Sequence, residues 1–253
     1  MCGIAGYFGK KPIAGKVISN TLYLMRRRGP DGQDVKTIEV DDKHRCLFLH
    51  SRLSIIDLDS RSSQPFYYNG KELIFNGEIY NYKEIKNELI KLGHCFITES
   101  DTEVLIHALD EWAEGAFEKL EGMWALALYD RKSKTLLLSR DRFGEKPLYI
   151  YRPEPDEIYF GSEIKFISEM AQKSFKPNLN HISRFLVNGY KSLYKVQETF
   201  FEGISEISSA TNLNITTNGK VVINKYWAPI FVEKEAVVRR FDKFLEQRKN
   251  RIR

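Results

Sequence analysis

The sequence predicts an α+β protein built largely from antiparallel sheet. Short apolar runs of strand composition follow one another closely through the first two thirds of its 253 residues, separated by polar turns. Parallel strands need a crossover of a dozen or more residues, so this close spacing favours antiparallel pairing. With 42% hydrophobic residues and three cysteines, the chain can bury a sizeable core without a disulfide framework.

In the first half of the sequence, apolar runs and turn residues indicate where strands and helices begin and end. An apolar run at 4–8 is expected to be a strand that ties the N-terminus into the sheet, and a helix with an apolar face should follow before residue 26. Strand-like runs occur at 47–49, 52–55 and 73–75, with a hairpin turn at 68–71 and a loop at 76–78 that is expected to interrupt the last strand.

Two helices and four strands are expected next. Asn81 with Glu84 resembles a capping box that opens a helix ending at Gly93, and a second helix carries the apolar residues of 105–112. Strands are expected at 124–129, 135–138, 148–151 and 158–160.

The composition changes after residue 176. A helix-like segment at 184–190 precedes a stretch rich in Ser, Thr and Asn, in which Asn218-Gly219 indicates a hairpin. Residues 233–253 follow helical spacing and hold 8 basic against 4 acidic residues, so they predict a basic amphipathic tail helix. We expect three segments: 1–176, a connecting 177–232 and the tail 233–253.

Charge and hydropathy exclude several classes of partner. Outside the tail, 31 basic residues face 30 acidic ones, so no basic groove for a nucleic acid is expected. No apolar stretch approaches the roughly 20 residues of a membrane span, and the few cysteines fit a cytoplasmic protein. His44 with Cys46 and His94 with Cys95 are too close in sequence to converge on one metal ion, so we expect buried thiols, ordinary histidines and no metal site.

Cys2 is the strongest candidate for chemistry. Removal of Met1 would leave a cysteine with a free α-amine, whose intrinsic pKa is about 7.7 to 8.0. That amine can accept the thiol proton directly or through a water, as in enzymes with an N-terminal threonine nucleophile. The alternative, an inert cysteine at a frayed terminus, is disfavoured by the apolar run that follows it.

Several motifs resemble those of one family, the class II glutamine amidotransferases, in that family's order. They are Met1-Cys2-Gly3-Ile4-Ala5-Gly6, Arg28-Gly29-Pro30-Asp31, His50-Ser51-Arg52-Leu53-Ser54-Ile55-Ile56-Asp57, Gln64-Pro65, Asn76-Gly77-Glu78-Ile79-Tyr80-Asn81, Ser100-Asp101-Thr102-Glu103 and residues 140–149 (RDRFGEKPLY). The residues in these motifs most resemble those in the glutaminase half of asparagine synthetases, although sugar amidotransferases share many of the same residues. The resemblance implies a four-layer αββα sandwich of two antiparallel sheets, with a short C-terminal extension.

The resemblance also implies roles, each with a chemical reason. Asn76 and the Gly77 N–H would hold the oxyanion that forms when a carboxamide is attacked. Arg52 would bind the glutamine α-carboxylate through two parallel hydrogen bonds, and Asp101 the α-ammonium. Asp101 also belongs to a good helix start, so it can serve both purposes. Leu53, Ile55 and Glu78 would line the same pocket. Glutamine hydrolysis through a Cys2 thioester needs no cofactor.

Three matters stay open at this level. Asparagine synthetases carry a further ATP-dependent domain with a Gly-Gly loop, and this sequence has no Gly-Gly pair. ATP and magnesium are therefore expected only on a synthetase domain carried elsewhere, such as another chain. The sequence does not choose among a split enzyme, a truncated or frameshifted product, a glutaminase with another acceptor and a catalytically idle binding or regulatory subunit. The ammonia acceptor and the oligomeric state are open.

Overall fold

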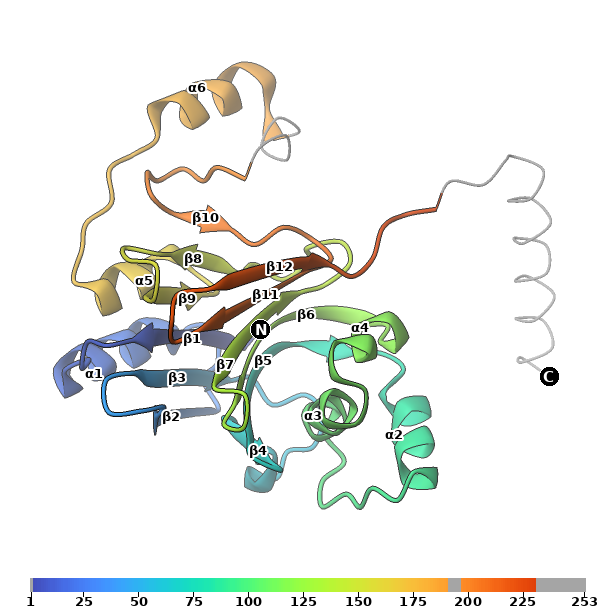
Figure 1. The fold of residues 1–253 in the computed structure, drawn as a ribbon. Helices are drawn as coiled ribbons and strands as arrows, with labels where there is room; N and C mark the ends of the chain where they lie inside the picture. Colours follow the sequence, from blue (N-terminus) through green and yellow to red (C-terminus); the bar gives the residue numbers. More distant parts are fainter. Residues whose placement is uncertain (1, 191–196, 231–253) are drawn as a thin grey trace, which may run out of the picture.

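Two antiparallel six-stranded sheets form the body of the protein (Figure 1), as seen in a computed structural model that describes residues 2–190 and 197–230. The first sheet has the order β10 (Ser205–Glu206), β8 (Tyr149–Tyr151), β9 (Ile158–Gly161), β1 (Gly3–Gly9), β3 (Arg45–Arg52) and β2 (Gly32–Glu39). The second has the order β12 (Val221–Lys225), β11 (Thr211–Thr216), β7 (Thr135–Arg140), β6 (Gly122–Asp130), β5 (Lys71–Ile79) and β4 (Phe66–Tyr68).

Helices cover the outer faces of both sheets. Helices α1 (Gly15–Met25) and α5 (Ile164–Ala171) pack on the first sheet, and α3 (Asp101–Trp112) packs on the second beside α2 (Tyr82–Lys91) and the short α4 (Ala116–Lys119). Helix α6 (Leu179–Asn188) lies in the extension. The expected antiparallel α+β sandwich with sheets between helices is confirmed.

Three apolar cores correspond to the three interfaces between these layers. Ile4, Phe8 and Ile74 belong to the core between the sheets, while Ala5 and Tyr7 belong to the core between the first sheet and its helices. Strand β1 is therefore buried along its whole length. This explains why its sequence is apolar throughout instead of alternating, and it fixes the backbone that directly follows Cys2.

Three local predictions are wrong. Residues 53–55 are not a strand, because β3 ends at Arg52. Residues 76–78 are not a loop, because β5 continues to Ile79 with Asn76 opposite Ala125 and Gly77 opposite Trp124 on β6. The side chain of Asn81 does not cap α2, since its amide group donates to the Lys119 carbonyl and accepts from the Glu121 N–H, both at 2.9 Å.

Both predicted hairpin turns are present. Asn69 and Gly70 adopt positive φ angles of 44° and 81° between β4 and β5, as a tight hairpin requires. The Asn218-Gly219 turn joins β11 to β12, and β11 pairs with β7, so the extension adds strands to the second sheet. The segment boundaries at 176 and 232 remain predictions.

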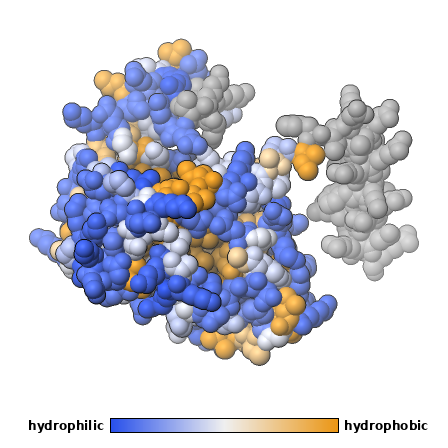
Figure 2. All heavy atoms as spheres, in the orientation of Figure 1, coloured by the Kyte–Doolittle hydropathy of each residue, from blue (hydrophilic) through white to orange (hydrophobic). Residues whose placement is uncertain are grey.

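The surface seen in Figure 2 is mostly polar, with apolar residues gathered over the edge strand β12, where Val222 and Ile223 are exposed. Within the described ranges, none of the helices has the length and apolar character that crossing a bilayer demands. The predicted tail helix at 233–253 lies outside the described residues.

Candidate functional site

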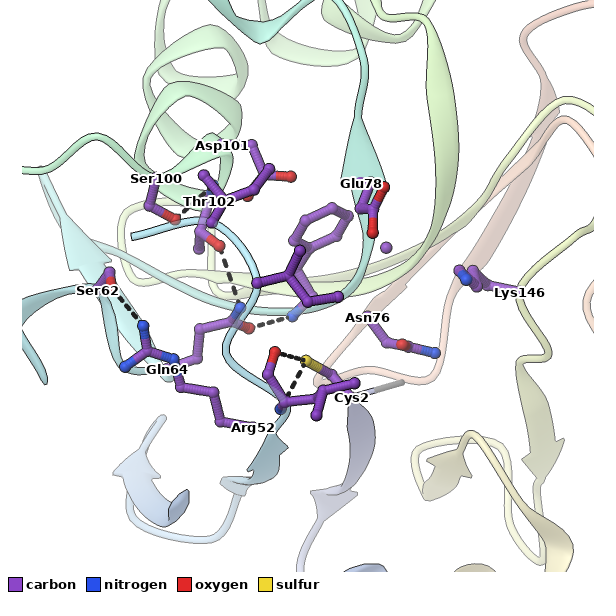
Figure 3. Close-up of a pocket in the computed structure, with 15 residues that line it drawn as sticks. Cys2, Arg52, Ser62, Gln64, Asn76, Glu78, Ser100, Asp101, Thr102 and Lys146 are labelled. Carbon is purple, nitrogen blue, oxygen red and sulfur yellow. Dashed lines mark hydrogen bonds between the residues drawn. The ribbon is translucent and has the colours of Figure 1, made fainter. Parts of the chain in front are cut away.

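One pocket lies where the N-terminus, the end of β3, the second half of β5 and the start of α3 come together (Figure 3). The two sheets and α3 bring these segments close although they are far apart in sequence. The lining includes all eight residues that the sequence singled out: Cys2, Arg52, Leu53, Ile55, Asn76, Gly77, Glu78 and Asp101.

Cys2 is held in place on both sides. Its sulfur accepts the Leu53 N–H at 3.3 Å and lies 3.5 Å from the Leu53 carbonyl oxygen. Its own carbonyl accepts the Arg28 Nε–H at 2.9 Å, and Arg28 is anchored in turn by Glu163 at 3.2 Å. Burial raises the pKa of the Cys2 thiol above its ordinary value, and the bond from the Leu53 N–H opposes this. A thiol in this position needs a nearby base before it can attack.

The pairing of β5 determines where the Gly77 N–H points. Opposite it, the N–H and C=O of Trp124 bond to the side chain and backbone of Asp141, away from β5. Gly77 and Trp124 are thus a non-hydrogen-bonded pair, and the Gly77 N–H points away from β6. The N–H groups of Phe75 and Ile79 point the same way and bond to Gln64 and Asp101. In the described part of the chain, no acceptor takes the N–H of Gly77 between them.

Residue 77 has no room for a side chain. A Cβ atom there would lie 2.1 Å from the Met123 carbonyl oxygen and 2.8 Å from the Trp124 Cα. Beside it, Asn76 is 1% exposed, and its amide nitrogen Nδ2 is buried without a partner among the residues described. A buried amide without a partner is costly unless a ligand satisfies it. In the part of the chain that the structure describes, two N–H donors without acceptors therefore line the same pocket as Cys2.

Arg52 lies at the end of β3 with its guanidinium held by the loop that follows. Nη1 donates to the Asp59 carbonyl at 3.0 Å and to the Ser63 hydroxyl at 3.4 Å. Nη2 donates to the Ser62 hydroxyl at 2.6 Å and also to the Asp57 carbonyl. A ligand carboxylate could form two bonds with these nitrogens only by replacing some of the loop acceptors.

Asp101 is the first residue of α3, and the Ser100 hydroxyl caps this helix by accepting the Thr102 N–H at 3.1 Å. Asp101 is 6% exposed, and its carboxylate accepts the Ile79 N–H at 3.0 Å. Burial, together with the nearby charge of Glu78, raises its pKa to about 6. Asp101 is thus an anion near neutral pH, placed to attract a cation.

Sequence reasoning missed other residues of the lining. Gln64, Ser62, Ser100, Thr102 and Lys146 also contribute to the pocket. All except Ser62 stand in the motifs quoted above, but nothing in those motifs indicates which members face the cavity.

The predictions for the remaining cysteines and histidines have mixed outcomes. Cys46 is buried as expected, but Cys95 is exposed, because it follows the last turn of α2 in a surface segment. His94 and His107 contact each other through their Nδ1 atoms at 2.9 Å. In the ranges described, no three His, Cys, Asp or Glu side chains group as metal ligands would.

Comparison with known proteins identifies the family of the chain. A family model described as a glutamine amidotransferase domain matches residues 1–227. The chain is 34% identical over 248 residues to the glutamine-hydrolysing asparagine synthetase 3 of Bacillus subtilis, covering 96% of this chain and 38% of that protein. With the glutamine-hydrolysing asparagine synthetase 2 of Oryza sativa it shares 33% identity over 201 residues, which cover 77% of this chain and 32% of that protein. The chain thus spans less than two fifths of the length of these relatives.

Among solved structures, the glutamine phosphoribosylpyrophosphate amidotransferase of B. subtilis superposes with a TM-score of 0.66 at 18% identity, over 90% of this chain and 50% of that one. That likeness concerns the fold, which is the fold of N-terminal-nucleophile amidotransferase domains. The fold and the family match over residues 1–227 therefore point to the same group of proteins. The chain belongs to the class II glutamine amidotransferase domain family and is homologous to the N-terminal part of asparagine synthetases.

Proposed function

We propose that this domain hydrolyses glutamine to glutamate and ammonia with Cys2 as its nucleophile. After removal of Met1, the Cys2 α-amine takes the thiol proton, directly or through a water, and the thiolate attacks the side-chain carbonyl carbon of glutamine. The carbonyl oxygen becomes an oxyanion, which the Asn76 amide and the Gly77 N–H stabilise. The amide nitrogen takes the proton and leaves as ammonia. Water then hydrolyses the glutamyl thioester, which gives glutamate and restores the thiol.

The observation that carries this proposal is the pair of donors without partners beside the thiol. If this region had only a structural role, the buried Asn76 amide would be expected to have a hydrogen-bond partner within the protein. Here, among the described residues, the buried amide nitrogen of Asn76 and the backbone N–H of Gly77 both lack acceptors. An oxyanion would supply the missing acceptor for each of them.

Substrate binding follows from the charges of the pocket. Asp101 attracts the α-ammonium group of glutamine, and Glu78 adds negative charge beside it. Arg52 binds the α-carboxylate once loop acceptors such as the Ser62 hydroxyl have been replaced. Leu53 and Ile55 enclose the aliphatic part of the substrate.

The direct test is release of glutamate from glutamine by the purified protein. We expect Cys2→Ala to abolish turnover, while Cys95→Ala, at an exposed cysteine outside the pocket, retains it. Thermal unfolding should show that both variants are folded. Undiminished glutamate release by Cys2→Ala would refute the mechanism.

For the fate of the ammonia, we propose transfer within an asparagine-synthetase-like system. The support is the similarity to glutamine-hydrolysing asparagine synthetases. In this arrangement, ATP and magnesium would be used on a synthetase domain outside these residues. Addition of aspartate and ATP to the complete system should then yield asparagine.

One observation favours a second candidate, an idle binding module. The Arg52 guanidinium is engaged by the loop acceptors, which compete with a ligand carboxylate. Calorimetric titration of the Cys2→Ala protein with glutamine separates the two candidates. The enzyme predicts saturable binding that Arg52→Lys weakens, because lysine lacks the planar pair of donors. The idle module predicts no binding of glutamine.

A further inference from the structure

Gln64 forms hydrogen bonds to two parts of the pocket: the strand with the proposed oxyanion donors and the helix start with the proposed ammonium site. It is 7% exposed and follows the 3₁₀ turn Ser60–Ser62 just before β4. Its side-chain oxygen accepts the Phe75 N–H at 2.5 Å, next to Asn76. Its side-chain nitrogen donates to the Thr102 hydroxyl at 3.1 Å, next to Asp101. One buried amide therefore connects the strand of the oxyanion donors to the helix start of the ammonium site.

The free edge of β5 shows what this connection achieves. Strand β4 pairs only with residues 71–73, so the later N–H groups on that side need other acceptors. Gln64 takes the N–H of Phe75 and Asp101 takes that of Ile79. The N–H of Gly77 lies between these two and has no acceptor among the described residues. The two acceptors thus also fix the strand on either side of the donor.

The residues just before Gln64 reach the third binding group. Ser62 and Ser63 accept hydrogen bonds from Arg52 at 2.6 Å and 3.4 Å. The short segment 62–64 consequently contacts Arg52, the strand of Asn76 and Gly77, and the helix of Asp101. Any change in its position alters the distances among the proposed carboxylate, oxyanion and ammonium sites.

We propose that Gln64 is a positioning residue that sets the separation between the α-amino-acid anchors and the oxyanion donors, and so selects glutamine over the shorter asparagine. This inference rests on the proposed function. A substrate shorter by one methylene, held by the same anchors, places its carbonyl oxygen away from Asn76 and Gly77. Discrimination of one methylene is worth about 10- to 200-fold in enzymes. Oxyanion donors must also lie within about 2.7 to 3.1 Å of the charge that develops.

The test uses Gln64→Met, which keeps the volume of the side chain and removes both hydrogen bonds, and Thr102→Val, which removes the bond to α3 alone. Gln33→Met is the matched control, because Gln33 lies on β2 outside the pocket and donates to the Leu22 carbonyl. For each protein, kcat and KM for glutamine, kcat/KM for asparagine and the melting temperature are measured.

We expect Gln64→Met to lower kcat for glutamine by about 10-fold or more with KM changed less than about threefold, since the anchors remain while the donors shift. The preference for glutamine over asparagine should fall by about 10-fold. Thr102→Val should show part of both effects. The double variant should lose no more than Gln64→Met alone, because the two residues share one connection. Gln33→Met should match the wild type.

Unchanged kcat and unchanged preference in Gln64→Met would overturn the positioning role, as would losses in the double variant that simply add. A lower melting temperature with an unchanged preference would also overturn it, since it would show a purely structural role. If Gln64→Met fails to fold, Thr102→Val is used instead, and unchanged kcat and unchanged preference in that variant would likewise overturn the positioning role. Absence of glutamate release by the wild type would refute the proposed function itself, which is a different result.

Discussion

The Asp101 carboxylate accepts the backbone N–H of Ile79 at 3.0 Å, and this bond fastens the start of α3 to the strand that carries Asn76 and Gly77. The same carboxylate is buried and has a pKa raised to about 6. One residue thus fixes the geometry of the pocket and provides a charge that titrates within the range of ordinary assays.

This pKa predicts a pH-dependent affinity for glutamine. Below pH 6, Asp101 binds a proton and loses the charge that attracts the α-ammonium, so KM should rise as pH falls, approaching about tenfold per pH unit. In Asp101→Asn, the amide oxygen can still accept the Ile79 N–H, but no charge titrates. KM of this variant should be high at pH 8 and nearly constant down to pH 5. Equal slopes of KM against pH in both proteins would contradict the role of Asp101.

The Asn76 amide can be tested with a side chain of the same shape. Asn76→Asp keeps the volume but replaces the donor by an oxygen that repels an oxyanion. We expect kcat to fall by about 100- to 1,000-fold with a much smaller change in KM. Asn20→Ala, at an exposed residue of α1, serves as the control. Steady-state kinetics that show a higher KM with unchanged kcat would indicate a binding role instead.

Gly77 should tolerate no side chain. Gly77→Ala places a Cβ 2.1 Å from the Met123 carbonyl oxygen, so β5 must shift away from β6. We expect a loss of about 1 to 3 kcal/mol in the free energy of unfolding and at least a tenfold loss of kcat. Gly15→Ala is the control, since nothing lies within 4 Å of its added Cβ at the start of α1. Denaturant titration and glutamate release measure both effects, and a fully active Gly77→Ala would refute this view of the strand.

His107 predicts a loss of stability in mild acid. Its ring is stacked between Tyr68 and Phe96, at centroid distances of 3.7 Å and 4.5 Å, and contacts His94. Burial lowers its pKa to about 4 from 6.5. Between these values the unfolded chain binds a proton that the folded chain does not, so this residue lowers the free energy of unfolding as pH falls, by up to about 1.4 kcal/mol per pH unit.

The measurement compares unfolding by urea at pH 7 and pH 5 in the wild type and in His107→Gln. The variant removes one titrating group, so its stability should fall less between the two pH values, whatever its stability at pH 7. Identical falls would show that His107 does not titrate in this way.

Short local signals allowed the antiparallel α+β class to be predicted, whereas the sandwich and the roles of the eight candidate residues were implied by motifs that resemble those of a known family. The apolar run of β1, the turn at Asn69-Gly70 and the helix start at Ser100-Asp101 each depend on neighbours in the chain. The continuation of β5 through residues 76–78 could not be seen, because it depends on pairing with β6 more than forty residues away. Local chemistry favoured a turn at Asn76-Gly77, and the long strand pairing overrode it.

Contacts across the fold were hidden for the same reason. The motif Gln64-Pro65 does not reveal that its amide reaches both Phe75 and Thr102. Nor does Arg52 reveal that its guanidinium meets the carbonyls of the following loop. Such bonds require the tertiary structure, and they bear on how the pocket selects its substrate.

The most direct test of the central claim is the intact mass of the mature protein before and after treatment with a glutamine-like diazoketone. We predict a protein without Met1 that gains one covalent adduct, located at Cys2 by peptide mapping, with excess glutamine slowing the reaction. Cys2→Ala should gain none. A mature protein that retains Met1, or an adduct on Cys95 in place of Cys2, would contradict the account.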